Sequence, residues 1–189
     1  MKIAPGQSKS ARQTGRSEAV ILFVVGNQMF AISAGAVHEI RSTDSLSGSA
    51  TAISQDRIPK VRQRMRRGAK FLYVVNAGEH FGLPPSKPLL VLVLRGARVA
   101  VLADRIERMD SISLLLSLPR TFRGPERTWY RGLTLIDEEI VPVLSPAGFL
   151  TEGELSFLDQ VSSAADATAT QAAAATDTPS EGVAGALPL

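Results

Sequence analysis

An acidic residue at the end of an apolar run is the first place in this sequence where chemistry could reside. The stretch 91–109, VLVLRGARVAVLADRIERM, places two apolar runs around a polar turn, and Asp104 follows the second run. Glu107 would share a face with Asp104 on a helix, but on a strand the two lie on opposite faces. No GxSxG motif or neighbouring histidine accompanies them. We therefore expect Asp104 to be a structural acid that accepts hydrogen bonds from backbone or from an arginine.

The other candidate residues for chemistry also lack the partner residues that a catalytic or metal site needs. Residues 137–139, Asp-Glu-Glu, form a charged group of the kind common in solvated turns, and His38 and His80 are more than forty residues apart with no HExxH motif. The chain has no cysteine, which excludes disulfides and thiolate sites. It also has no GxxxxGK[ST] loop and no GxGxxG fingerprint. The sequence therefore predicts no catalytic residue, no metal site and no cofactor, and so no enzyme.

A basic segment, residues 57–70, is the remaining candidate site. It carries seven positive charges, whereas residues 151–189 carry six acids and no Lys or Arg. Such a run could contact the phosphates of a nucleic acid. It contains no aromatic residue before Phe71, so a stacking platform for bases is missing within it. A solvated loop or a docking face for an acidic protein explains the segment equally well.

The elements that must position these residues are mostly strands. Apolar runs begin at Ala19, and Gly-Asn at 26–27 is typical of a hairpin turn. Further extended segments are expected at 37–40 and 71–75, in the 91–109 hairpin, and in TWYRGLTLI and IVPVL near residue 140. Turn residues recur about every ten positions. This spacing predicts an all-β architecture of small barrels or a sandwich.

The two ends of the chain differ from this pattern. Residues 1–18 are polar and are expected to be disordered. Thr151 and Glu154 form a capping-box pattern that predicts a helix over 151–162, packed on the domain. The Ala-rich acidic stretch 163–189 is expected to be a disordered tail. No signal peptide and no apolar run of about 20 residues is present, which favours a soluble, cytoplasmic protein.

Three segments in order resemble the CheW-like family of chemotaxis scaffold domains. They are ILFVVGNQMFAISAGAVHEI, PLLVLVLRGARVAVLADRIERMDSI and RTWYRGLTLIDEEIVPVLSPAGFL, and together they span residues 19–150. The resemblance implies two intertwined, SH3-like, five-stranded barrels with a short C-terminal helix. It implies a non-enzymatic adaptor that couples the cytoplasmic tip of a chemoreceptor to the regulatory domain of a histidine kinase. The alternative function is a small β-barrel that binds nucleic acid through residues 57–70.

The resemblance also implies site residues. Val37, Glu39 and Ile40 match the family's V-x-E-I segment, and Arg67 with Gly68 matches its Arg-Gly step. A Glu39–Arg67 salt bridge is implied, with Arg66 as the competing partner, and Val37 and Ile40 are candidates for an apolar receptor groove. The sequence departs from the family after Gly68, where an expected proline is missing and Asn76 stands near the position of an Asp. This region usually lies near the kinase-binding surface of the family.

Overall fold

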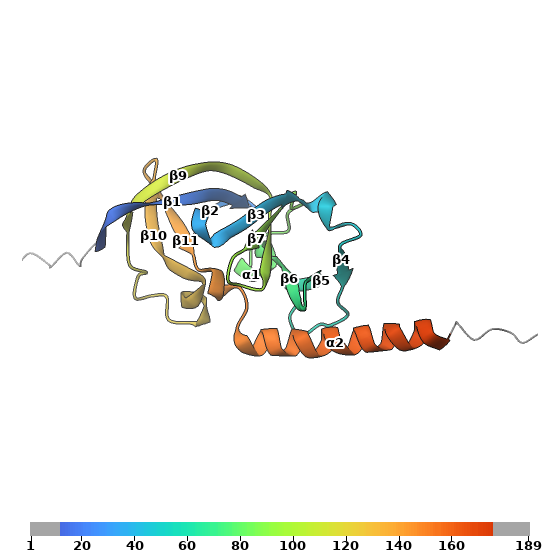
Figure 1. The fold of residues 1–189 in the computed structure, drawn as a ribbon. Coiled ribbons are helices and arrows are strands. Elements are labelled where there is room, and N and C mark those ends of the chain that lie inside the picture. Colours follow the sequence, from blue (N-terminus) through green and yellow to red (C-terminus); the bar gives the residue numbers. More distant parts are fainter. Residues whose placement is uncertain (1–11, 176–189) are drawn as a thin grey trace, which may run out of the picture.

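Two sheets and a long C-terminal helix make up the part of the chain, residues 12–175, that the computed structural model describes (Figure 1). The first sheet has five strands in the order β10-β11-β2-β1-β9. Their bounds are β10 Tyr130–Ile136, β11 Glu139–Leu144, β2 Gln28–Ser33, β1 Arg12–Val25 and β9 Arg105–Leu115. A bridge between Leu116 and Leu133 joins the two ends of this sheet, so the sheet closes into a barrel.

The second sheet has six strands in the order β3-β7-β8-β6-β5-β4. Their bounds are β3 Val37–Ser42, β7 Leu90–Leu94, β8 Val99–Ala103, β6 Lys70–Asn76, β5 Val61–Arg67 and β4 Ala50–Ala52. The family resemblance implies five strands, and the three-residue β4 beside β5 is the additional one. The β7–β8 hairpin turns at residues 95–98, as the polar turn in the sequence predicts.

Two separate segments of the chain form the first barrel. The chain forms β1 and β2 there, builds β3 to β8 in the second barrel, and returns as β9 to β11. β9 pairs with β1 along most of its length, from Val24 opposite Arg105 to Arg12 opposite Leu115. The two barrels are therefore intertwined, and the expected all-β fold of two SH3-like barrels is confirmed.

Short helices connect the strands. They are the 3-10 helices η1 Ala34–Ala36, η2 Thr43–Leu46, η3 Pro125–Trp129 and η4 Pro146–Gly148, and the α-helix α1 Ala77–Phe81. The Asn76 side chain caps α1 by accepting from the backbone N–H of Glu79 at 3.3 Å. Asn76 therefore has a local role, since it ends β6 and begins α1.

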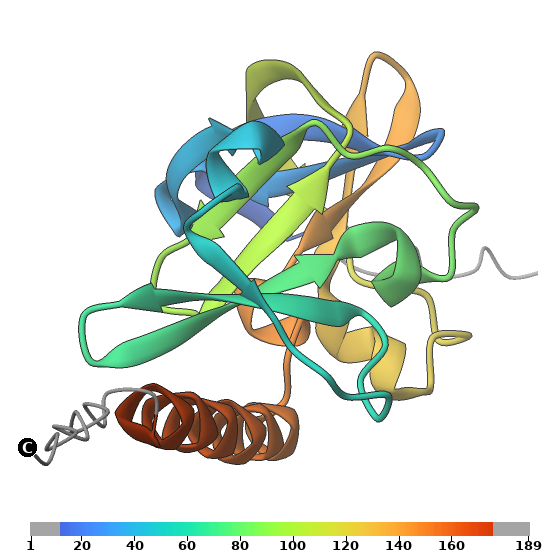
Figure 2. The same ribbon diagram turned by 90° about the vertical axis from the view of Figure 1, so that its right-hand side faces the viewer.

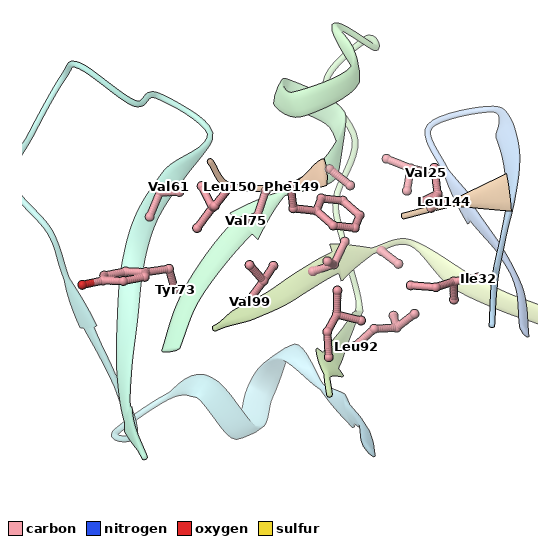
Figure 3. Close-up of a cluster of buried hydrophobic side chains, with 14 of the residues drawn as sticks. Val25, Ile32, Val61, Tyr73, Val75, Leu92, Val99, Leu144, Phe149 and Leu150 are labelled. Atoms are coloured by element: carbon pink, nitrogen blue, oxygen red, sulfur yellow. The ribbon is translucent and has the colours of Figure 1, made fainter. Parts of the chain in front are cut away.

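One apolar core lies between the barrels (Figure 3). Each barrel also has a core of its own. Along β1, Phe23 and Val25 face the shared core, whereas Val20 and Leu22 face the interior of the first barrel. Strands β6, β7 and β8 divide their alternate residues in the same way between the shared core and the second barrel. Burial on both faces explains the continuous apolar runs at residues 20–25 and 91–94.

The C-terminal helix α2, Glu152–Ala175, runs along the second barrel (Figures 1 and 2). Its start matches the capping box: the Thr151 N–H donates to Glu154 Oε2 at 2.8 Å, and the Glu154 N–H donates to Thr151 Oγ1 at 3.2 Å. Leu158 is fully buried in the shared core. The helix thus packs on the domain through its first turns.

At both ends the structure is more regular than the expected disorder. The helix continues beyond Ser162 to Ala175, because Asp166 forms ion pairs with Arg64 and Arg66 of β5 and an Ala-rich sequence favours helix. β1 begins at Arg12 because backbone pairing with β9 extends to that residue. The rest of the expected disordered ends, residues 1–11 and 176–189, lies outside the described residues.

Asp104 occupies the corner where β8 passes into β9. Its Oδ2 accepts a hydrogen bond of 2.6 Å from the Gly26 N–H, and its Oδ1 accepts one of 2.8 Å from the Ser86 hydroxyl. Its own N–H donates to the Val24 carbonyl at 2.9 Å. Gly26 has φ of +59° in the β1–β2 turn, which a residue with a side chain rarely adopts. The acid therefore links the crossover between the barrels to the first hairpin.

His80 is the buried titratable residue of α1. It is 5% exposed among Phe81, Trp129 and Phe149, and its Nε2 has no hydrogen-bond partner among the described residues. Burial, reinforced by the positive charge of Lys60, lowers the pKa of His80 to about 4. The imidazole is therefore neutral in the folded protein at neutral pH.

Replacing Asp104 by Ala should destabilise the fold, because the Gly26 N–H and the Ser86 hydroxyl lose their acceptor. We expect the free energy of unfolding in urea to fall by roughly 1–3 kcal/mol. The matched control is Asp56→Ala, since Asp56 is fully exposed and its ion pair within residues 12–175 is a 3.7 Å contact with Arg62. A loss no larger for Asp104→Ala than for this control would contradict the structural role.

Lowering the pH from 7 to 5 should destabilise the protein through His80. The unfolded chain takes up a proton on this residue below about pH 6.5, whereas the folded protein does so only near pH 4. The free energy of unfolding should therefore fall by about 2 kcal/mol over this interval. His80→Phe should remove most of this slope in urea titrations, and His38→Gln should retain it. An unchanged slope in His80→Phe would refute the assignment.

Candidate functional site

Strand β3 carries the V-x-E-I segment at the edge of the second sheet. It pairs with β7 on one side only, with Glu39 opposite Val93 and Ile40 opposite Leu92. Val37 points into the shared core and is 7% exposed, whereas Ile40 is 40% exposed. Of the two residues expected in an apolar groove, Ile40 is thus the one that a partner can reach.

Glu39 and Arg67 line the same small hollow, of about 150 Å³, together with Arg41 and Arg66. Among the described residues, Glu39 forms its ion pair with Arg41, at 2.8 Å. Residues two apart on a strand point to the same face, so Arg41 is the nearer partner by construction. The structure therefore brings Glu39 close to Arg67 without pairing them.

Arg67 and Gly68 lie at the turn between β5 and β6. Arg67 is opposite Lys70, so Gly68 and Ala69 form the connection, and Gly68 has φ of +61°. A left-handed conformation favours glycine at this position. Arg66, the competing partner, forms a 3.5 Å ion pair with Asp166 of α2. The Arg-Gly step is therefore an exposed hairpin tip, next to an arginine, Arg66, that pairs with α2.

Acids of helix α2 pair with three of the seven cations of the basic segment, Lys60, Arg64 and Arg66. Lys60 pairs with Glu154 at 2.8 Å, and Arg64, 5% exposed, donates to the Ser162 carbonyl at 2.7 Å and pairs with Asp166. Burial alone would raise the pKa of Glu154, but the contacts with Lys60 and Thr151 hold it below its ordinary value. The charge asymmetry of the sequence thus corresponds to an intramolecular contact between the barrel and its C-terminal helix.

A second contact anchors α2 through Asp159. Arg98 binds this carboxylate with both terminal nitrogens, one of them at 2.7 Å, and the Tyr73 hydroxyl donates to it at 2.6 Å. The hydrogen bonds from Arg98 lower the pKa of Asp159. Burial, together with the hydrogen bond to Asp159, raises the pKa of Tyr73 to about 12. A bidentate arginine–carboxylate pair fixes direction as well as distance, so it orients the helix on the barrel.

The acids and histidines that could support chemistry remain separate. The turn at Asp137 and Glu138 has φ of +48° and +67°, and Asp137 pairs with Arg108. His38 is exposed on β3, whereas His80 is buried in α1. No group of three or more His, Asp or Glu side chains in the described part of the chain is placed to hold a metal ion. The candidate contact features on the described surface are therefore strand edges, exposed apolar side chains and arginines.

Sequence reasoning missed the ion pairs between the cations of the second barrel and the acids of α2. Charge alone shows that one segment is basic and another acidic, but the pairing depends on where α2 lies in three dimensions. A signal was available in the spacing of Asp159 and Asp166, seven residues apart. This spacing places both acids on one face of a helix.

Comparisons with known proteins agree with this geometry. A family model described as CheW-like domain matches residues 19–154. The crystal structure of the scaffolding protein TtCheW from Thermoanaerobacter tengcongensis is similar in fold, with a TM-score of 0.60 and 14% sequence identity. The superposition covers 78% of this chain and 97% of that chain. The search of curated proteins finds no match.

No helix within residues 12–175 combines the length and apolar character needed to cross a membrane. The family match extends over well more than half of the 189 residues and includes both barrels. It ends at residue 154, so nearly all of α2 lies beyond it. The expected resemblance is confirmed, and the chain belongs to the CheW-like domain family.

Proposed function

We propose that this chain is a non-enzymatic chemotaxis adaptor that couples a chemoreceptor to a histidine kinase. The observation that carries the proposal is the family match over residues 19–154 on a two-barrel fold. The proposed partners are the cytoplasmic tip of the receptor and the regulatory domain of the kinase. The proposal places the protein in the cytoplasm and requires no cofactor.

The edge strand β3 supports a binding role for the second barrel. An edge strand presents unpaired backbone groups, which partners use for strand addition. Ile40 adds an exposed apolar side chain beside them, and Val37 fixes the strand by packing into the shared core. We assign the receptor to this strand, with Ile40 as the contact and Val37 as the residue that positions it.

The first barrel offers a separate apolar surface. Leu135 and Ile140 lie opposite each other on β10 and β11 and are 53% and 63% exposed. A pair of large exposed aliphatic side chains on adjacent strands is a candidate contact for a protein partner. An adaptor requires at least two such surfaces, and here they lie on different barrels. We assign the kinase regulatory domain to the face that Leu135 and Ile140 form.

Nucleic-acid binding has less support from the geometry. Lys60, Arg64 and Arg66 of the basic segment contact acids of α2. The guanidinium of Arg64 lies over the ring of Phe71, 4.4 Å from its centroid, in a position that a stacked base would need. Protein binding is therefore the function that we propose.

Replacing Ile40 by Asp should weaken receptor binding. A charge introduced at an apolar contact costs desolvation, so we expect at least a tenfold loss of affinity, about 1.4 kcal/mol. The measurement is pull-down and titration with the receptor cytoplasmic fragment and, separately, the kinase regulatory domain. Ile140→Asp is the matched control for receptor binding, since it is an exposed strand residue on the other barrel.

Two results would count against the proposal. If the unmodified chain binds neither fragment, the adaptor function is wrong. If it binds both fragments but Ile40→Asp leaves receptor binding unchanged, the receptor lies elsewhere on the chain.

We further propose that Glu39 and Arg67 act as a pair when a partner is bound. Glu39→Arg and Arg67→Glu should each weaken partner binding about tenfold, and the double charge swap should restore at least half of the lost binding free energy. The control is the charge swap of Glu39 and Arg41, which form an ion pair in the free chain. Because this pair is exposed, it should contribute no more than about 1 kcal/mol to the free energy of unfolding. If the double variant loses as much binding free energy as the two single variants together, Glu39 and Arg67 do not pair.

A further inference from the structure

Two hairpin turns and the start of β3 surround a second hollow on the second barrel. It measures about 430 Å³ and is lined by Leu94, Gly96, Ala97 and four basic-type side chains, those of His38, Arg67, Arg95 and Arg98. Arg95 is held in place because its Nε donates to the Val37 carbonyl at 3.0 Å. Lys70 stands opposite Arg67 in the adjoining β5–β6 turn. We call Arg67, Lys70 and Arg95 the outer basic triad.

The described residues of the chain do not neutralise the outer basic triad. No carboxylate among the described residues forms an ion pair with any of its three members, and all three are exposed. Cations gathered around one hollow raise the local positive potential and attract anions. The hollow therefore has the electrostatic character of a site for a negatively charged partner.

The neighbouring surface shows which anions this arrangement accepts. Arg98, which lines the hollow, already binds the Asp159 carboxylate with both terminal nitrogens. Arg64 and Arg66, in the strand that leads to Arg67, bind Asp166. Both ligands are carboxylates presented by a helix of the same chain. The outer basic triad continues this arginine surface beyond the acids that α2 supplies.

We propose that the outer basic triad binds an acidic segment of a protein partner, with two or more carboxylates that meet Lys70, Arg95 and the nitrogens of Arg67 that Glu39 does not use. The inference rests on the proposed adaptor function and adds the chemistry of the partner segment. The described acids of α2, a helix that lies almost wholly beyond the residues that the family model matches, pair with Lys60, Arg64, Arg66 and Arg98 and with no member of the triad. The triad thus adds electrostatic selection of the partner to the apolar contacts of the barrels.

The rings near the hollow favour a protein over a nucleic acid. Arg64 and Arg66 lie over Phe71, at 4.4 and 5.9 Å from its centroid, and Arg98 lies over Tyr73 at 5.4 Å. The guanidinium groups thus lie over these rings, in positions that a stacked base would need. Carboxylates need only the outward nitrogens of the arginines.

The test uses the full chain and two probes, the kinase regulatory domain and the receptor cytoplasmic fragment, titrated at 50 and 300 mM NaCl. Lys70→Glu combined with Arg95→Gln should weaken binding of one probe at least tenfold at 50 mM NaCl and reduce the salt dependence of that affinity. Lys70→Arg combined with Arg95→Lys keeps both charges and should retain binding. Arg120→Glu combined with Arg123→Gln, in the loop before η3, makes the same change of net charge elsewhere and should have no effect. Thermal unfolding verifies that each variant is folded.

The outcomes separate this inference from the proposed function. If neither probe binds the unmodified chain, the adaptor function fails, and with it the basis of this inference. If both probes bind and the Lys70/Arg95 variant matches the Arg120/Arg123 variant, the acidic-segment inference is wrong while the adaptor function stands. If a single-stranded DNA oligonucleotide binds the unmodified chain and the Lys70/Arg95 variant loses it, the hollow recognises nucleic acid and the inference is overturned.

Discussion

The corner at Asp104 is the constraint on which the intertwined barrels depend. The chain leaves the second barrel there, and its next residues must enter the ladder beside β1 in one register, with Arg105 opposite Val24. The Asp104 N–H bonded to Val24 and the Asp104 carboxylate bonded to Gly26 fix that register at its first step. A slip of one residue would turn Ile112 out of the first-barrel core, because alternate residues face opposite sides of a strand.

The features that could be predicted from the sequence are those with local causes. The Gly-Asn turn, the β7–β8 hairpin and the capping box of Thr151 depend on residues within a few positions, and the ordered family segments indicated the two barrels. The extension of α2 to Ala175 and of β1 back to Arg12 depend on partners distant in the chain, Arg64 in one case and Leu115 in the other. The Glu39–Arg41 pair has a local cause, a spacing of two residues on one strand, but the family resemblance implied the more distant Arg67 as the partner of Glu39.

Helix α2 changes the meaning of the basic segment. Read as sequence, seven positive charges in residues 57–70 suggest a surface for phosphates or for an acidic partner. In the fold, α2 contacts the centre of that segment, and Leu158 in the shared core holds the helix there. Arg67 and Lys70 at the β5–β6 turn, and Arg95 at the β7–β8 turn, pair with no carboxylate of the described residues. A polar helix thus decides which part of a basic surface remains open to partners.

Coupling between two partners requires that the surfaces they contact keep a fixed relation. In this chain the shared core supplies that relation, because strands of both barrels and α2 pack into one apolar cluster with close-packed side chains. Ile40 is attached to it through Val37, and β11, which carries Ile140, contributes Leu144 to it. In the adaptor function that we propose, this shared packing is what would keep the two contact surfaces in a fixed relation.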